Sequence, residues 1–368
     1  MSRIPFVDLR RAFEPIQSEI REAIDRVLEK QDFVLGEEVE QFERRFAAYC
    51  GAQHCVTVAT GTAALQLALL GSGIRPGDEV ITQPNTYFAT VAAIMNVGAR
   101  PVFADVAPPE YSIDLEAVEA AITPRTRAIV CVHLFGQPCD VDALAAIATK
   151  YHLLLIEDAS QAHGAVVREK RIGSRSDTVA TFSFYPSKNL GALGEGGCVL
   201  TADAAIAERI RMLRNHGSSN KFVHEMVGQN ERLDTLKAAV LLVKLRHLDG
   251  WLTERRQIAA RYDALLPELE RPLVKIDMKH AFHLYPILVS NRDELRRVLL
   301  ERGVETSIHY PVPCHLQRAA AGLCYVAGDF PNAENLARRE LSLPVYPGLT
   351  DDEIQRVAAN VEEFAARG

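Results

Sequence analysis

From Cys55 onward, short apolar runs bounded by turn residues alternate with stretches whose apolar positions repeat with a helical period. Most of the runs lack strict apolar-polar alternation, which is typical of central strands covered on both faces. They occupy residues 55–59, 79–83, 101–106, 128–134, 153–158, 178–184 and 197–202. Helical stretches lie between several of them, over 62–73, 115–126 and 140–152, the last with Asp140 or Asp142 as a candidate N-cap. The pattern predicts an α/β fold with an open, mostly parallel seven-stranded sheet, whose ligands sit beyond the C-terminal strand ends.

The pattern changes after Thr201. Long helical stretches cover 204–217 and then 232–270, with a bend expected near Asp249 and Gly250. Strand patterns return at 281–290 and 304–313, with a helical stretch over 293–303 between them. We therefore predict a large domain over 1–246 and a smaller α+β domain over 247–368, with the long helix connecting them.

Composition and charge exclude several classes of protein. The 368 residues are 48% hydrophobic and 24% charged, which indicates a soluble globular chain long enough for two domains. The net charge is −7 and no basic block stands out, so a nucleic-acid partner is not expected. The seven cysteines include no CxxC pair, which argues against a disulfide framework or a metal site of the zinc-ribbon kind. No signal peptide or apolar run of about 18 residues is present, so we expect no membrane span and a cytoplasmic location.

Two carboxylates end the apolar run 153–158. Glu157 and Asp158 follow LLLI, so at least one of them is expected to be buried and to need a cationic partner. The alternative is a helix N-cap, because Asp158 or Ser160 could cap the segment that follows. The sequence leaves these two interpretations open.

A lysine and several glycines follow the run 178–184. Lys188 is the fourth residue after the run and is followed by four glycines within nine residues. A lysine held at a strand end among apolar groups can have a lowered pKa and act as a Schiff-base nucleophile. The alternative is an exposed loop lysine. A Walker phosphate loop is excluded, because the lysine precedes the glycines.

A third feature lies between the run 55–59 and the helix after it. Thr60, Gly61 and Thr62 place the first-turn N–H groups of that helix at the sheet's C-terminal edge, which favours an anion site. Ordinary capping by Thr60 or Thr62 is the alternative. The spacing does not fit a dinucleotide fingerprint, because GxGxxG is missing.

One ligand would use all three features. Pyridoxal phosphate needs a lysine for its aldehyde, a carboxylate to keep its ring nitrogen protonated, and a cradle for its phosphate. Lys188, once freed by a substrate amine, could then carry the proton between the substrate α carbon and the cofactor. The combination points to amino-group transfer.

The same segments resemble a known family. The runs ATGTAALQLAL, EVITQPNTYFATVAAI, IEDASQAHGA, FSFYPSKNLGALGEGG, GQNERLDTLKAAVL and IHYPVPCHLQ are similar, in this order, to those of the DegT/DnrJ/StrS family of sugar aminotransferases. The resemblance extends from about Phe6 to Pro347. It implies the fold-type I aspartate-aminotransferase architecture, pyridoxal 5'-phosphate as cofactor, and a homodimer with two shared active sites.

The resemblance assigns roles to the residues of the three features. Lys188 matches the Schiff-base lysine, and Asp158 matches the partner of the pyridine nitrogen. Gly61, Thr62 and Ser183 match the phosphate cradle. Ser183 could also be a strand residue without a ligand.

Three further cofactor residues follow from the resemblance. Tyr87 matches the aromatic residue that stacks on the cofactor ring, and a core residue is the less favoured alternative. Gln161 matches the residue that faces the ring hydroxyl. Asn230 matches an asparagine that reaches the phosphate of the neighbouring subunit, so a lone protomer is expected to be an incomplete enzyme.

The resemblance also suggests substrate contacts. His309, Tyr310 and His315 lie in a segment similar to one near the substrate mouth, and Tyr185 and His163 flank the cofactor motifs. A histidine in such a position is as often a packing residue.

The residues around the lysine indicate the substrate branch. Many relatives that act at sugar carbon 4 have histidine three residues before the lysine, where this chain has Tyr185. The flanking stretches resemble the branch that aminates 3-keto-6-deoxyhexoses attached to dTDP, with L-glutamate as donor. A UDP-linked 3-keto uronate and a 4-keto sugar are the alternative substrates.

Two questions stay open at the level of sequence. The chain could be a pyridoxal-phosphate-binding regulator without turnover, because one fold hosts several functions. The cations for the substrate diphosphate are expected from Arg214, Lys221 or the neighbouring subunit, and no spacing rule selects among them.

Overall fold

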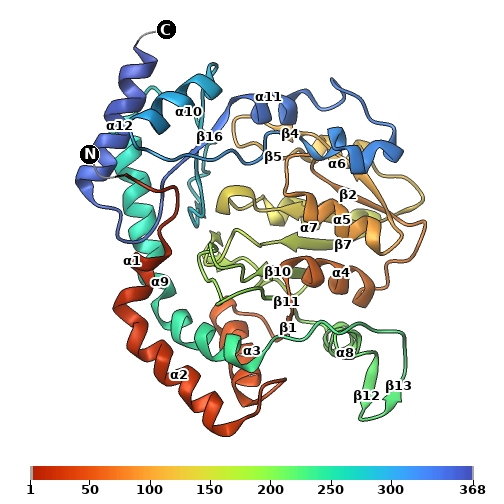
Figure 1. The fold of residues 1–368 in the computed structure, drawn as a ribbon. Coiled ribbons are helices and arrows are strands. Elements are labelled where there is room, and N and C mark those ends of the chain that lie inside the picture. The colour runs from red at the N-terminus through yellow and green to blue at the C-terminus, as the bar shows by residue number, and fades with distance from the viewer. Residues whose placement is uncertain (1–2, 367–368) are drawn as a thin grey trace.

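The computed structural model describes residues 3–366 and contains the predicted sheet (Figure 1). Its strand order is β1-β11-β10-β7-β6-β2-β3, and β11 alone runs antiparallel to its neighbours. The seven strands fall within or beside the seven predicted runs: β1 (His54–Val58), β2 (Glu79–Thr82), β3 (Arg100–Phe103), β6 (Thr126–Val132), β7 (Leu154–Asp158), β10 (Thr178–Ser183) and β11 (Gly197–Thr201). The predicted fold class is confirmed.

Helices cover both faces of this sheet, which explains the continuous apolar runs. One face packs against α3 (Glu37–Cys50), α6 (Leu115–Ala120), α7 (Val141–Tyr151) and the first half of α9 (Thr235–Leu265). The other packs against α4 (Gly61–Gly71), α5 (Phe88–Asn96) and α8 (Ala204–Leu213). On β6, Ile129 and Cys131 join the first core and Ala128 and Val130 join the second. Alternate residues of one strand therefore serve two separate cores.

A further core, separate from the two on the sheet, lies at the C-terminal end of the chain. It is built on the antiparallel pair β15 (Tyr285–Leu288) and β16 (Glu340–Leu343), with α10 (Arg292–Glu301), α12 (Asp351–Ala365) and the second half of α9. Ile4 belongs to this core and bridges to Val304. The N-terminal end of the chain thus packs with the C-terminal core, while the predicted boundary at residue 246 falls inside α9.

The long helix α9 runs continuously from Thr235 to Leu265, through Asp249 and Gly250, where the sequence predicts a bend. Its first half also packs against α2 (Gln17–Lys30), which follows α1 (Leu9–Phe13) and the 3-10 turn Glu14–Ile16. Its second half contacts α12. The predicted strand over 304–313 is absent from the described structure, where single bridges form at Val304 and Ser307 instead.

Smaller elements complete the described fold. They are the two-stranded pair β4 (Val106–Ala107) and β5 (Ser112–Ile113), the sheet of β8 (Val166–Val167), β9 (Lys170–Arg171) and β14 (Met278–Lys279), the hairpin of β12 (Ser218–Asn220) and β13 (Val223–His224), helix α11 (Pro331–Arg339), and the 3-10 turns Leu134–Gly136, Cys314–Leu316 and Arg318–Leu323. The β12–β13 hairpin projects beyond α8 (Figure 1). No helix among residues 3–366 is long and apolar enough to cross a membrane.

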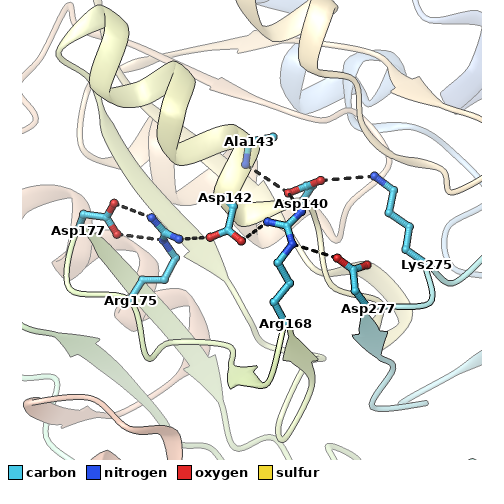
Figure 2. Close-up of polar contacts among 8 residues, drawn as sticks. All are labelled: Asp140, Asp142, Ala143, Arg168, Arg175, Asp177, Lys275 and Asp277. Carbon is cyan, nitrogen blue, oxygen red and sulfur yellow. Dashed lines mark hydrogen bonds and ion pairs between the residues drawn. The ribbon is translucent and has the colours of Figure 1, made fainter.

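A network of ion pairs joins the small β8-β9-β14 sheet to α7 (Figure 2). Asp142, in the first turn of α7, binds both Arg168 and Arg175. Arg168 Nε also lies 3.0 Å from Asp277 Oδ2, next to β14. Of the two candidate caps, Asp140 is the N-cap of α7 and accepts the N–H of Ala143. Because several charges share partners, the network fixes this corner better than isolated surface pairs would.

Candidate active site

A cavity of about 550 Å³ opens at the C-terminal ends of β7 and β10. Parallel sheets of this kind place their ligands at that edge. Segments of the C-terminal part of the chain close the cavity from the other side, through His283, His309 and Tyr310. Ten residues expected in the site line it: Gly61, Thr62, Tyr87, Asp158, Gln161, Ser183, Tyr185, Lys188, His309 and Tyr310.

Lys188 lies in the loop that follows β10. Its backbone N–H bonds to the carbonyl of Tyr185 at 2.9 Å, so the loop turns back on itself and directs the residue to the cavity. Burial lowers the pKa of Lys188 to about 8, and the negative charge of Asp158 opposes part of this shift. Roughly a tenth of the amine is therefore neutral at pH 7, far more than for an ordinary lysine, and the neutral form is the nucleophile.

Asp158, the last residue of β7, is 5% exposed and lines the cavity. Its Oδ2 accepts a hydrogen bond from Thr90 Oγ1 at 2.8 Å, and its Oδ1 accepts the N–H of Ser160 at 3.2 Å. The contact with Ser160 closes a turn and is not a helix N-cap, because β7 is followed by strands and turns up to α8, and the carboxylate faces the cavity. Both of these donors are neutral, so a ligand that brings a cationic N–H group, such as a pyridinium, fits this carboxylate.

Glu157 points to the opposite face of the strand, as the two-residue period requires. It is fully buried, with Oε2 3.1 Å from His133 Nε2 and Oε1 accepting from Thr178 Oγ1 at 2.6 Å. His133 Nδ1 accepts the N–H of Cys139, so the proton on Nε2 is directed at Glu157. Of the two adjacent carboxylates, Asp158 therefore belongs to the cavity and Glu157 to the core.

The first turn of α4 lies against the end of β10. Thr60 Oγ1 accepts the N–H of Ala63 at 2.9 Å, so this threonine is the N-cap. The N–H groups of Gly61 and Thr62 come earlier in the turn, have no acceptor within the helix, and line the cavity together with Ser183. A Cβ on Gly61 would lie 2.5 Å from Ser183 Cβ, so glycine is required for this close approach. The turn fits a phosphate group.

Two residues expected on the cofactor ring are held in different ways. Tyr87 is 61% exposed, which rules out the core interpretation, and its ring centroid lies 5.5 Å from that of Tyr310. Gln161 is buried and fixed at both ends of its amide. Its Oε1 accepts the N–H of Phe135 at 2.6 Å, and its Nε2 donates to Tyr310 Oη at 3.2 Å. The residues of the cavity therefore fit pyridoxal phosphate at its aldehyde, ring nitrogen and phosphate.

Residues 14–362 match the model of the DegT/DnrJ/EryC1/StrS aminotransferase family. The chain belongs to this family. It is 48% identical, over 99% of its length and 97% of the relative's, to dTDP-3-amino-3,4,6-trideoxy-alpha-D-glucose transaminase of Streptomyces venezuelae. It is also 48% identical, over 98% of its length and all of the relative's, to the erythromycin biosynthesis sensory transduction protein EryC1 of Saccharopolyspora erythraea. The crystal structure of S. venezuelae DesV in complex with a ketimine intermediate matches with a TM-score of 0.98 and 47% identity, covering 100% of both chains.

Two histidines suggested by the aminotransferase motifs lie outside the cavity. His163 is fully buried, packs against Phe182 with ring centroids 5.2 Å apart, and has a pKa that burial lowers to about 3. His315 is 2% exposed, and its Nε2 lies 3.2 Å from Glu334 Oε1. Neither ring lines the cavity, so the expectation that they contact substrate is corrected: within this protomer both are packing residues.

Two other expectations concern residues that do not line the cavity. Asn230 is exposed and forms a bridge with Asn215 near the β12–β13 hairpin. Arg214 is 7% exposed, and its Nη1 donates to Glu43 Oε1 at 2.6 Å and to the carbonyl of Thr57 at 2.7 Å. This arginine ties α8 to β1 and α3 and is not available for a diphosphate, which corrects the expectation for it.

Sequence reasoning missed some residues of the family site. His283 lines the cavity, and its Nδ1 has no hydrogen-bond partner among residues 3–366. Burial, followed by the nearby charge of Lys188, holds the pKa of His283 well below its usual value. Thr90 was missed because its contact with Asp158 joins residues 68 positions apart. The run AFHLYPILVS reads as a strand, and no local signal marks His283 as facing the site.

Proposed function

We propose that this aminotransferase moves an amino group from L-glutamate to carbon 3 of a 3-keto-6-deoxyhexose attached to dTDP. The observation that carries the proposal is the meeting of Lys188, Asp158 and the open first turn of α4 in one cavity. The branch is supported by Tyr185 before the lysine and by the name of the S. venezuelae transaminase. UDP-linked 3-keto uronates and 4-keto sugars are the competing substrates.

Pyridoxal 5'-phosphate, when bound, supplies the electron sink that lets an amino group leave one carbon and join another. The N–H groups of Gly61 and Thr62, with Ser183 Oγ, would bind its phosphate, and Asp158 would hold the proton on its ring nitrogen. Gln161, fixed by Phe135, would face the ring hydroxyl.

Two side chains act from outside the phosphate cradle. Tyr87 would cover one face of the cofactor ring, since its own ring is exposed to the cavity. The lowered pKa of Lys188 allows its Nζ to accept and return a proton near neutral pH.

The working unit in this proposal is a homodimer with two shared sites. Its support is Asn230, which is exposed and does not line the cavity of its own chain, together with the preceding β12–β13 hairpin, which projects beyond α8 (Figure 1). Lys221 and Phe222 lie on the same hairpin, and Phe222 is 84% exposed. A second copy would receive this hairpin and bury its apolar surface. The cytoplasmic location expected from the sequence stays a prediction.

The test presents the purified enzyme and glutamate with a panel of 3-keto and 4-keto nucleotide sugars, with product analysis by mass spectrometry. Amination of a dTDP-linked 3-keto sugar supports the proposal, and amination of only the 4-keto sugar contradicts the branch. Lys188→Ala should abolish both turnover and the borohydride-trappable cofactor adduct. Lys244→Ala is the matched control, because burial also lowers the pKa of Lys244 to about 8 while its Nζ donates to the Gly191 carbonyl.

A regulator without turnover is the second candidate, and the name of EryC1 favours it. The presence of Lys188, Asp158, Gln161 and Asn230 favours catalysis. The two functions differ in one observation: the visible absorption band of a catalyst shifts when glutamate is added, and that of a regulator without turnover does not.

A further inference from the structure

His309 is held from behind by a chain of hydrogen bonds that the cofactor residues do not use. Its Nδ1 lies 2.9 Å from Ser342 Oγ, and this hydroxyl lies 2.5 Å from Glu340 Oε1. The other carboxylate oxygen, Glu340 Oε2, accepts the backbone N–H of His309 at 2.6 Å. Glu340 and Ser342 lie on β16 and are 0% exposed, so water does not compete for these contacts. We call Glu340, Ser342 and His309 the relay.

The relay has one consistent assignment of protons while Glu340 is ionised. A carboxylate only accepts hydrogen bonds, so the hydroxyl proton of Ser342 points to Glu340. The Ser342 oxygen then offers a lone pair to His309, which requires the ring proton to be on Nδ1. Burial, followed by the charge of Lys188, lowers the pKa of His309 to about 4, so the ring carries only this one proton near neutral pH. Nε2 is therefore a bare lone pair as long as Glu340 is ionised.

His309 lines the same cavity as Lys188 and Gln161. It is fixed on two further sides, by Phe6 with ring centroids 5.7 Å apart and by Tyr310 at 5.4 Å. Because Nδ1 is bonded to β16, Nε2 is the polar atom left for a ligand. A nitrogen of such low basicity accepts a hydrogen bond but is a poor general base near neutral pH.

We propose that Glu340 and Ser342 are positioning residues that hold His309 as a hydrogen-bond acceptor toward the substrate, so that the site selects a keto-sugar with a hydroxyl group next to its reacting carbon. The identity of the substrate rests on the proposed function, whereas the proton position on His309 does not. A sugar without that hydroxyl binds more weakly, because it leaves a buried acceptor without a partner.

Glu340→Gln reverses the relay with almost no change of shape. The amide oxygen still accepts the N–H of His309, so the amide NH₂ faces Ser342 and donates to it. The Ser342 proton then goes to Nδ1, and the ring proton of His309 moves to Nε2. The polarity that the substrate meets is inverted.

Nitrogen-15 NMR of the histidine-labelled enzyme, carrying its cofactor, measures this directly. At about pH 9 the Glu340 carboxyl, whose pKa burial raises to about 7, is ionised. We expect Nδ1–H in the wild type and Nε2–H in Glu340→Gln, with the His309 signals identified by their loss in His309→Gln. In Ser342→Ala, the added Glu340→Gln change should no longer move the proton. The relay is overturned if the ring proton of His309 has the same position in the wild type and in Glu340→Gln. It is also overturned if Glu340→Gln still moves this proton when Ser342→Ala is present.

Kinetics give the second readout. Glu340→Gln should lower kcat/KM for the keto-sugar roughly 10- to 100-fold and change the half-reaction with glutamate less than about threefold. Glu79→Gln is the matched control, because Glu79 is 3% exposed, accepts Thr123 Oγ1 at 2.5 Å, and does not line the cavity. Equal losses in both half-reactions would show general damage and overturn the positioning role. If the wild type aminates no keto-sugar, the proposed function fails, while the NMR result still decides the relay.

Discussion

Gly61 is the position where a single methyl group tests the phosphate cradle. A Cβ there would lie 2.5 Å from Ser183 Cβ and 2.9 Å from Ser183 Oγ, whereas ordinary contacts begin at 3.4 Å. Gly61→Ala must therefore move the first turn of α4 away from β10 by roughly 1 Å. Overpacking of this kind costs about 1–3 kcal/mol. The movement separates the Gly61 N–H from the Ser183 hydroxyl. Both groups would hold the cofactor phosphate.

Binding of pyridoxal phosphate has to reverse that displacement, so the cost appears in the cofactor affinity. At about 1.4 kcal/mol per factor of ten, we expect the Kd of Gly61→Ala to rise roughly 10- to 100-fold. The assay is a titration of the cofactor-free protein with pyridoxal phosphate, followed by absorbance, together with a thermal unfolding scan of each variant.

Gly71, at the other end of α4, provides the matched control. Its Cβ would lie 2.6 Å from Ile210 Cγ1, so Gly71→Ala also overpacks this helix, but at a point that does not line the cavity. Both variants should lose stability, and only Gly61→Ala should lose affinity. An unchanged Kd for Gly61→Ala, or equal weakening in both variants, would refute the cradle.

Three further predictions concern other parts of the molecule. The rate at which Lys188 captures pyridoxal phosphate covalently should rise roughly tenfold per pH unit below pH 8 and level off above it. Only the neutral amine attacks the aldehyde, and burial lowers the pKa of Lys188 to about 8. A rate that does not depend on pH would contradict this. Thr90→Val removes a donor to buried Asp158 and should lower the free energy of unfolding by about 1.5–3 kcal/mol in urea denaturation. Gly250 lies in the middle of α9, and a Cβ there would meet no atom within 4 Å. Gly250→Ala should therefore raise the free energy of unfolding by about 0.5–1 kcal/mol, and a lower free energy of unfolding would contradict this.

The central sheet could be predicted from sequence because burial on two faces leaves a strong local signal. Each of its seven strands contains a continuous apolar run bounded by turn residues, and β6 shows why, with Ile129 in one core and Val130 in the other. The antiparallel direction of β11 leaves no such signal, since apolar residues read the same in either direction. Short strands such as β12 and β13 also contain too few residues to show a repeating pattern of apolar and polar positions.

The cofactor residues could be predicted where a motif is local, and the rest of the site could not. Asp158 ends a strand, and Gly61 and Lys188 each follow one within a few residues, so chain order alone brings them to one edge. The partners of Gln161 come from residues 26 and 149 positions away. Arg214 shows the opposite error, because its ion pair with Glu43 spans 171 positions and removes it from the surface.

This distribution separates the two tasks of the site. The large sheet supplies the cradle, the carboxylate and the lysine, all fixed at strand ends and therefore suited to a cofactor that stays the same. The other wall comes from residues 283, 309 and 310, which belong to connecting segments of the C-terminal part. Because such segments change more readily than strand ends, a family can keep the cofactor chemistry while altering the sugar. In this chain one residue of that C-terminal wall, His309, is nevertheless held in place, because Ser342 and Glu340 of β16 bind it. Substrate choice would therefore depend on residues that never touch the sugar, and a comparison limited to cavity-lining positions would overlook them.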